Sequence, residues 1–300
     1  MFLRLFGVLL ILSISQSSLA NCDDATDLLY QAYDLHSEGK SVTSEKWLVN
    51  MALESCPNLP EAENYLATLL ENESKYSQAI VHYKKAIELR SDFSQAWNGL
   101  GETYYKQGRF PLSLEAHLHA CQTDKDSKTR VVALLKENRY AITEAGKIID
   151  KESLLVLYDK SRQRAIDKML KACGLRFARV KPAAIFRNFE FAPRQATLPE
   201  DSEEQLEEIV AALINLQNQK IKIHGHTDTQ PFKDYPKAES NRLNRELSKK
   251  RAAAIAQAFI ERGIERSRIR IYGHGYHKPL VKKENRNAWR QNRRVEIEVD

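Results

Sequence analysis

The chain has few of the residues that mark unusual protein classes. It contains only 4 cysteines, 11 glycines and 9 prolines in 300 residues. So few glycines and prolines exclude a collagen-like or low-complexity chain. Four cysteines without a Cys-x2-Cys spacing are too few for a disulfide-scaffolded fold and argue against a structural zinc site. With 42% hydrophobic and 29% charged residues, the composition is that of a globular protein, and the length allows about two domains.

Long hydrophobic runs are also absent, apart from one stretch at the N-terminus. Leu5–Ile14 is a mostly apolar run that follows Arg4 and precedes Ser18-Leu19-Ala20. A membrane-spanning helix needs about 20 apolar residues, and no stretch of this sequence is that long. A short apolar core between a positive charge and small residues is typical of a secretory signal peptide. We therefore expect residues 1–20 to be a signal peptide and the mature chain to be exported, with an uncleaved anchor as the alternative.

The residues around the expected cleavage site allow a second form of processing. Leu19-Ala20-Asn21-Cys22 resembles a bacterial lipobox, in which the cysteine is acylated. A lipobox has a small residue directly before the cysteine, and Asn21 fits that requirement poorly. Cleavage after Ala20 is the favoured prediction, and lipidation of Cys22 remains the alternative.

Positive charge is concentrated in the C-terminal part of the chain. Residues 181–300 hold 23 Lys and Arg against 17 Asp and Glu, whereas residues 21–180 are nearly neutral. This asymmetry indicates an anionic partner for the C-terminal part.

A repeat of 34 residues fills the first half of the sequence. Trp97-x2-Leu100-Gly101-x2-Tyr104 begins its clearest copy. Residues at equivalent positions of a second copy are Leu66, Ala67, Leu70, Ala79, Tyr83 and Ala86, and those of a weaker third copy are Ala32, Gly39, Trp47, Ala52 and Pro57. The pattern resembles the tetratricopeptide (TPR) repeat, a pair of antiparallel helices. The resemblance implies an all-α TPR superhelix over residues 21–126 that binds a protein or peptide, although a spacer without a ligand is an alternative.

The next segment also has helical periodicity. Val131-Val132-x-Leu134-Leu135 and Leu154-Leu155-x-Leu157 recur at helical spacing, and Gly174 supplies a stop. We expect residues 127–182 to be a helical cap and linker.

A different pattern begins at residue 183. The predicted strands are Ile185–Phe191, Ile221–Ile223, Ile269–Ile271 and Val295–Val299, and the predicted helices are Asp201–Asn215 and Leu247–Arg262. The order β-α-β-α-β-β predicts an α+β sandwich domain over residues 183–300.

Four motifs within this domain resemble one family. They are Gly225-His226-Thr227-Asp228, Asn244-x2-Leu247-Ser248-x2-Arg251-Ala252, Gly273-x-Gly275 with Pro279, and Asn292-Arg293-Arg294-Val295. Their order and spacing resemble the C-terminal domain of outer-membrane protein A (OmpA-like), which peptidoglycan-associated lipoproteins and flagellar stator proteins share. The resemblance implies binding of the peptidoglycan stem peptide through its diaminopimelate residue.

The same resemblance implies the roles of individual residues. Asp228 would accept hydrogen bonds from the ligand's ammonium group, and Arg251 would bind a carboxylate. Thr227, Asn244 and Arg293 would add hydrogen bonds. A structural salt bridge between Asp228 and Arg251 is the alternative.

The sequence departs from the family pattern at three places. Ala192 stands where the family often has an aspartate, extra residues around Phe232–Asn241 lengthen the loop after Asp228, and Ala288-Trp289 replaces a common Gly-Arg. These departures predict weaker binding or a preference for another form of the stem peptide.

Two further interpretations concern catalysis and nucleic acid. His224, His226 and Asp228 alternate along a strand, and with His274 and His277 nearby they suggest a metal-dependent periplasmic hydrolase as the alternative function. The basic segment 286–294 with Trp289 resembles a nucleic-acid-binding run, which export argues against. No catalytic motif or nucleotide-binding loop is present. We therefore expect a protein that is not an enzyme, needs no cofactor or metal and binds no nucleic acid.

The cysteines form the last prediction. The start of the first helix and the end of the second lie side by side in a TPR repeat, which makes Cys22 and Cys56 neighbours. Cys121 and Cys173 are the other candidate pair. Their pairing stays open, because the sequence does not show the path of the chain between them. Export to an oxidising compartment favours pairing.

Together these observations predict an envelope protein without catalytic activity. It would lie in the periplasm at the cell wall, peripheral to the outer membrane, and anchor a partner on the TPR array to peptidoglycan.

Overall fold

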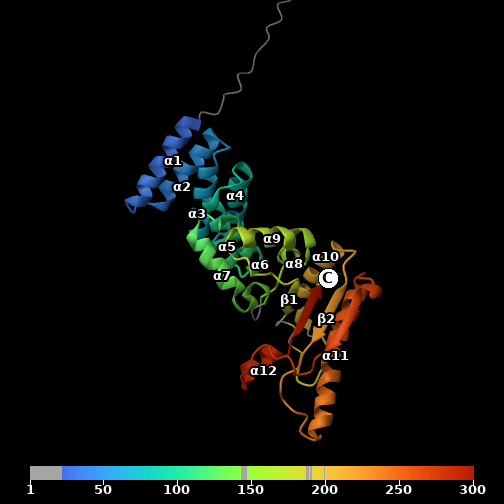
Figure 1. Cartoon of the computed structure of the whole chain (residues 1–300). Coiled ribbons are helices and arrows are strands. Elements are labelled where there is room, and N and C mark those ends of the chain that lie inside the picture. Colours follow the sequence, from blue (N-terminus) through green and yellow to red (C-terminus); the bar gives the residue numbers. More distant parts are fainter. Residues whose placement is uncertain (1–21, 143–146, 187–188, 190, 199) are drawn as a thin grey trace, which may run out of the picture.

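The computed structural model describes residues 22–142, 147–186, 189, 191–198 and 200–300. The expected signal peptide at residues 1–20 lies outside them. Figure 1 shows a helical N-terminal part followed by a C-terminal part that contains a sheet. None of the helices in the described ranges is long and apolar enough to cross a membrane.

The N-terminal part is an array of helix pairs, as the repeat predicts. The pairs are α1 (Cys22–Ser37) with α2 (Val42–Ser55), α3 (Pro60–Asn72) with α4 (Tyr76–Leu89), and α5 (Ser94–Lys106) with α6 (Phe110–Ala120). Small residues allow the helices of a pair to approach closely. A Cβ atom at Gly101 would lie 2.6 Å from Nε2 of the fully buried His117, so only glycine fits between α5 and α6.

Residues 127–182 are less regular than the sequence predicted. The segment consists of α7 (Lys125–Leu135), a 3₁₀ stretch η1 (Lys136–Ala141), α8 (Lys151–Tyr158) and α9 (Lys160–Ala172). Glu137 and Asn138 have φ values of 57° and 55°, which a right-handed α-helix does not contain. This explains why α7 ends at Leu135. Gly174 follows α9 with a φ of 80°, in agreement with the expected stop.

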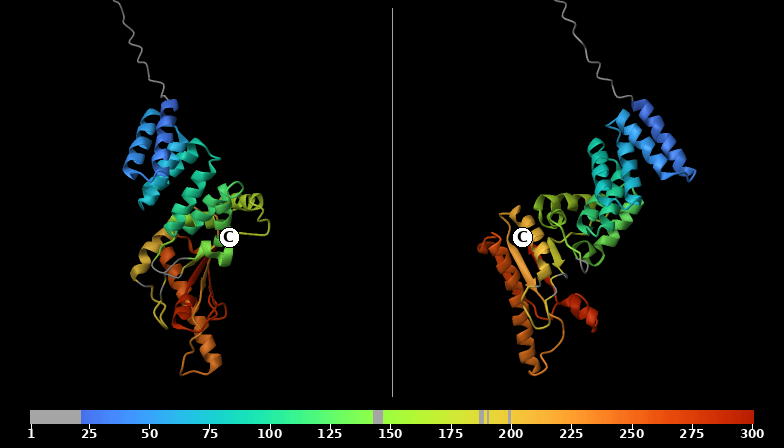
Figure 2. Two further views of the ribbon diagram at one scale, coloured as in Figure 1. Left: turned by 90° about the vertical axis from the view of Figure 1, so that its left-hand side faces the viewer. Right: turned by 180° about the vertical axis from the view of Figure 1, so that it is seen from behind.

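This linking segment packs against the C-terminal domain as well as against the array. The side-chain amide of Gln205 accepts a hydrogen bond from the Ile149 amide at 2.9 Å and donates one to the Ile149 carbonyl at 3.0 Å. The Tyr158 hydroxyl, at the end of α8, donates to the Ile297 carbonyl at 3.0 Å. Figure 2 shows α8 and α9 between the array and the sheet in both views.

The C-terminal domain contains a four-stranded sheet with the order β1-β4-β2-β3. The strands are β1 (Ala183–Phe186), β2 (Ile221–Gly225), β3 (Ile269–Gly273) and β4 (Val295–Val299). β2 and β3 are parallel, and β4 is antiparallel to both β1 and β2. β2 and β4 bury alternate residues, as half-covered strands do. The α+β fold class is therefore confirmed.

The helices of this domain differ from the predicted ones in extent. They are α10 (Glu203–Ile214), preceded by the short turn η2 (Glu200–Ser202), then α11 (Lys237–Glu261) with the turn η3 (Arg266–Arg268), and α12 (Arg286–Asn292). α11 begins ten residues before the expected start at Leu247, so part of the extra segment Phe232–Asn241 extends this helix instead of the loop. α12 was not predicted, because its seven residues carry no hydrophobic periodicity. The Asn285 side chain caps it by accepting a hydrogen bond from the Ala288 amide.

All four cysteines are paired in the structure. Cys22 is bonded to Cys56, with 5.0 Å between their Cα atoms, and Cys121 to Cys173, with 5.7 Å. The first bridge joins the start of α1 to the end of α2. The second joins the end of α6 to the end of α9 and so ties the linking segment to the array.

Candidate functional site

The site begins where the sheet touches its longest helix. A Cβ atom at Gly225, the last residue of β2, would lie 1.9 Å from the carbonyl oxygen of Ser248 in α11. No side chain fits there, so glycine allows the end of β2 to reach the helix backbone. This contact places the residues that follow β2 beside the middle of α11.

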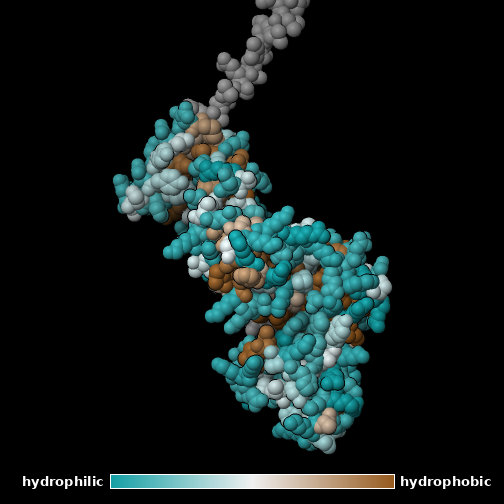
Figure 3. Space-filling model, in the orientation of Figure 1, coloured by the Kyte–Doolittle hydropathy of each residue, from teal (hydrophilic) through white to brown (hydrophobic). Residues whose placement is uncertain are grey.

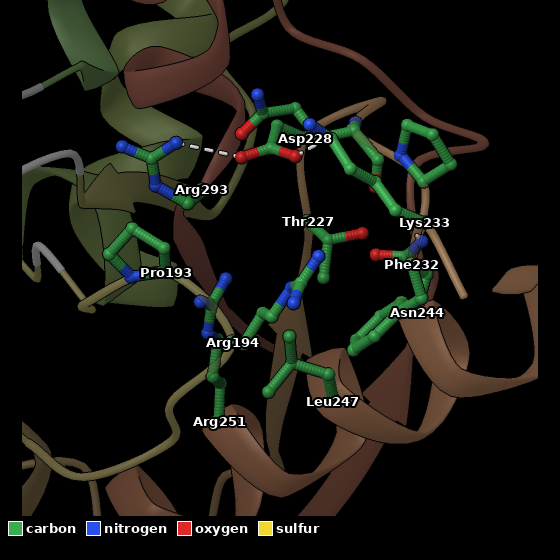
Figure 4. A pocket seen from close by; sticks show the side chains of 12 residues that line it. Pro193, Arg194, Thr227, Asp228, Phe232, Lys233, Asn244, Leu247, Arg251 and Arg293 are labelled. Carbon is green, nitrogen blue, oxygen red and sulfur yellow. Dashed lines mark hydrogen bonds and ion pairs between the residues drawn. The ribbon is translucent and has the colours of Figure 1, made fainter. Parts of the chain in front are cut away.

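All five residues that the sequence assigned to ligand binding line one pocket of about 120 Å³. Thr227 and Asp228 come from the end of β2, Asn244 and Arg251 from α11, and Arg293 from the residue after α12. Figure 4 shows their side chains facing a common space. A cavity needs about 10–15 Å³ by this measure to hold one water molecule, so the pocket is large enough for a small polar group of a ligand.

Asp228 is the one carboxylate among the described residues that line the pocket. Its Oδ2 accepts a hydrogen bond from Arg293 Nη1 at 2.7 Å, and its Oδ1 accepts one from the Gln230 amide at 2.9 Å. The side chain is nearly buried. Each carboxylate oxygen has a further lone pair, so Asp228 can still accept a hydrogen bond from a cationic ligand.

Arg251 is a buried cation whose partners are all neutral. Its Nε, Nη2 and Nη1 donate to the backbone carbonyls of Gln195, Ala192 and His226 at 2.9, 3.1 and 3.4 Å. The side chain is 1% exposed. Burial, and next the charge of Arg293, lower the pKa of Arg251 to about 10, and Asp228 opposes this shift. Of the five N–H groups of the guanidinium, two remain for a ligand.

The structure thus does not form the salt bridge between Asp228 and Arg251 that was the alternative to ligand binding. Asp228 pairs with Arg293 instead. Ala192, which lacks the family's aspartate side chain, contributes its backbone carbonyl to Arg251.

Two other predicted residues differ in how their polar groups are satisfied. Asn244 donates from Nδ2 to the Ser240 carbonyl at 3.2 Å and to the Gln230 carbonyl at 3.4 Å, which fixes the loop after Asp228. Thr227 is 3% exposed, and its Oγ1 has no hydrogen-bond partner in the structure. A buried hydroxyl without a partner is costly, so this group is available for a hydrogen bond to a ligand.

The pocket also contains residues that the motifs did not identify. They are Pro193, Arg194, Gln230, Pro231, Phe232 and Lys233. Most of them belong to the loop before α10 or to the segment where the sequence departs from the family pattern. The only sequence signal for Arg194 and Lys233 was the overall basic character of the C-terminal part.

The residues of the alternative metal site have different partners and do not face one common point. His224 Nδ1 is 2.9 Å from His274 Nε2, so the two imidazoles share a hydrogen bond, while Asp228 pairs with Arg293. His226 is buried, and neither of its ring nitrogens has a hydrogen-bond partner. Among the residues that the structure describes, no group of three or more His, Cys, Asp and Glu is arranged to hold a metal ion.

The burial of His226 predicts a pH-dependent stability. Burial, and next the charge of Arg294, lower the pKa of His226 to about 2. The folded protein therefore keeps this imidazole neutral where the unfolded chain, with an ordinary histidine pKa near 6.5, takes up a proton. Its contribution to stability is complete above pH 6.5 and is lost as the pH falls, by about 2 kcal/mol at pH 5.

Urea unfolding at pH 7 and pH 5 measures this contribution. The loss of unfolding free energy between the two pH values is expected to be about 2 kcal/mol smaller in His226→Gln than in the wild type. Exposed His277→Gln is the control and should keep the wild-type difference. An unchanged difference in His226→Gln would show that the imidazole titrates equally in the folded and unfolded chains.

Comparison with known proteins identifies two regions of the chain. Residues 190–293 match the OmpA family and residues 73–108 match a TPR repeat. The outer-membrane lipoprotein YfiB of Pseudomonas aeruginosa is 33% identical over 99 residues, which are 33% of this chain and 54% of that protein. The probable lipoprotein YiaD of Escherichia coli is 32% identical over 110 residues, 37% of this chain and 47% of that protein.

Further similarities are weaker. The peptidoglycan-associated lipoprotein of Pseudomonas aeruginosa is 27% identical over 79 residues, 26% of this chain and 42% of that protein. The crystal structure of the peptidoglycan-associated lipoprotein from Burkholderia pseudomallei is 21% identical, covers 37% of this chain and 88% of that chain, and has a TM-score of 0.34. The chain thus spans about half the length of the curated relatives that it matches.

Both resemblances seen in the sequence are confirmed by these matches. The motifs around Asp228, Arg251 and Arg293 lie within the OmpA match, and the repeat around Trp97 lies within the TPR match. The chain combines a TPR repeat at residues 73–108 with an OmpA-family domain at residues 190–293.

Proposed function

We propose that the protein is an envelope protein that anchors a partner to the cell wall. The OmpA-family domain binds peptidoglycan, and the TPR array holds an unidentified protein or peptide. The protein lies in the periplasm, associated with the cell wall and peripheral to the outer membrane, and performs no catalysis. The names of its relatives, outer-membrane lipoprotein and peptidoglycan-associated lipoprotein, support this location.

The observation that carries the proposal is the unbalanced charge of Arg251. A buried cation costs free energy unless an anion compensates it. Within the described residues, this guanidinium donates its hydrogen bonds to neutral backbone carbonyls and lies 5.1 Å from the centre of the Phe191 ring, and it forms no ion pair. A ligand carboxylate at its two remaining N–H groups supplies the anion. Asp228, on another wall of the pocket, accepts the ligand's ammonium group.

The free end of diaminopimelate in a stem peptide carries one ammonium and one carboxylate on the same carbon. This pair of charges matches Asp228, which would bind the ammonium group, and Arg251, which would bind the carboxylate. Thr227 Oγ1, which has no partner, and Asn244 and Arg293 supply further hydrogen bonds to it.

The partner on the array is the less defined half of the proposal. Tyr30 in α1 and Trp47 in α2 are 63% and 60% exposed, and large exposed aromatic residues are enriched where proteins bind one another. Figure 3 shows hydrophobic residues in patches over the helical part, whereas hydrophilic residues cover most of the C-terminal domain on the same face. Purification of the mature protein with its envelope partners tests this half.

Sedimentation with purified sacculi that contain diaminopimelate tests the wall-binding half. The chain 21–300 should pellet with sacculi, and Asp228→Ala and Arg251→Ala should each abolish most of the binding. Removing one member of a buried charge-assisted pair costs about 2–5 kcal/mol, which is roughly thirtyfold or more in affinity. Asp228→Asn keeps the shape of the side chain and should fail similarly, because its amide cannot neutralise an ammonium group.

Controls separate binding from folding. Asp234→Ala and Arg176→Ala remove the same charges from exposed positions outside the pocket and should pellet like the wild type. Circular dichroism shows whether each variant is folded. If folded Asp228 and Arg251 variants pellet as fully as the wild type, the site assignment is wrong.

A further inference from the structure

The pocket carries more positive charge than the proposed ligand end can neutralise. Among the described residues that line it, four are cationic, Arg194, Lys233, Arg251 and Arg293, and one is a carboxylate, Asp228. Asp228 and Arg293 neutralise each other through their ion pair. An amino-acid end with one ammonium and one carboxylate has no net charge, so it leaves the excess in place.

In the proposed function the ligand's carboxylate pairs with Arg251, which leaves Arg194 and Lys233 without an anion. In the part of the chain that the structure describes, neither residue makes an ion pair or a hydrogen bond, and no further contact of either is recorded beyond one ring. The Arg194 guanidinium lies 5.2 Å from the centre of the Phe232 ring, a cation–π contact that leaves its N–H groups free. Figure 4 shows Arg194 extending into the pocket beside Arg251, with Lys233 on the other side of the space.

The backbone at Arg194 supports a specific role for this side chain. Arg194 has a φ of 62°, in the left-handed region that costs a residue with a Cβ atom about 1 kcal/mol. Strained residues of this kind gather at binding sites. The conformation places the guanidinium over the pocket, above the ring of Phe232 from the segment where the sequence departs from the family.

We propose that Arg194 and Lys233 form a second anion subsite, which binds another carboxylate of the stem peptide. The inference rests on the proposed function and adds a preference to it. The pocket selects stem peptides in which carboxylates beyond the free amino-acid end are ionised, and it disfavours those in which they are amidated. Both side chains are exposed at the rim, so the preference is modest and weakens with salt.

Two synthetic tripeptides test the proposal by calorimetric titration of the chain 21–300. The first is L-alanyl-γ-D-glutamyl-meso-diaminopimelate, whose free end carries an ammonium and a carboxylate. In the second, that end is kept, and the glutamate α-carboxylate and the C-terminal carboxylate are amides. The first tripeptide should bind about fivefold more tightly, since an exposed ion pair contributes up to about that factor.

The variant Arg194→Gln/Lys233→Gln should abolish the difference between the tripeptides and bind the diamide as the wild type does. Lys168→Gln/Arg176→Gln removes the same charge from exposed positions outside the pocket and should retain the difference. Equal affinity of the wild type for both tripeptides overturns the second subsite alone, as does an equal loss for both in the pocket variant. Failure of the wild type to bind either tripeptide overturns the proposed function as well.

Discussion

Replacing Cys121 and Cys173 together by serine is expected to lower the free energy of unfolding by about 4 kcal/mol. The bridge closes a segment of 52 residues, and a crosslink of that span restricts the unfolded chain strongly in the chain-entropy account. Both cysteines are buried where α6 and α9 end, so the loss should appear in the unfolding of the helical part. Urea unfolding followed by circular dichroism measures it.

The other bridge is the matched control. Cys22→Ser/Cys56→Ser opens a shorter loop, of 34 residues, and should cost slightly less. Intact-mass analysis of the mature protein should show a gain of two hydrogen atoms for each bridge on reduction. A mature chain that begins at an acylated Cys22 would contradict the first bridge, because an acylated cysteine has no thiol to pair.

Replacing Gly225 by alanine should lower the free energy of unfolding by about 3 kcal/mol and also weaken wall binding. The added methyl group would lie 1.9 Å from the Ser248 carbonyl oxygen, which belongs to a helix backbone and cannot rotate away. α11 must therefore move from β2, and overpacking of this kind costs about 1–3 kcal/mol or more. The movement also separates Thr227 and Asp228, which follow β2, from Arg251 on α11.

Gly39→Ala separates this clash from backbone strain. Gly39 has a φ of 65°, and no atom lies within 4 Å of the position its Cβ would take. Alanine there should cost about 1 kcal/mol through strain alone and leave sacculus binding unchanged. If Gly225→Ala is as stable as Gly39→Ala, the contact between β2 and α11 is looser than the structure indicates.

The sequence predicted those parts of the protein that depend on periodicity or on a motif. Trp97 and Tyr104 occupy fixed positions of a repeat, and the repeat determines which helices pair. Asp228 and Arg251 each belong to a motif that is recognisable in the sequence. Both could therefore be assigned to one site without knowing the path of the segments between them. The predicted pairing of Cys22 with Cys56 followed from the geometry of antiparallel helices.

Other features depend on contacts that leave no local pattern. Arg194 and Lys233 come from irregular segments, and only the folded chain brings them to the pocket. Gln205 is a polar residue of α10, and its burial against the backbone of Ile149 follows from a contact between distant segments. α7 ends at Leu135 because Glu137 and Asn138, which follow it, have positive φ, and neither residue is glycine.

The hydrogen bond between Tyr158 and Ile297 has a mechanical consequence. β4, which contains Ile297, is an interior strand with β1 on one side and β2 on the other. Under the proposed function, tension between a partner on the array and the cell wall would enter the domain along the covalent chain at β1, which is an edge strand. The hydrogen bond of Tyr158 to Ile297 adds a second attachment, which ties α8 to the interior strand β4 and so to both of its neighbours.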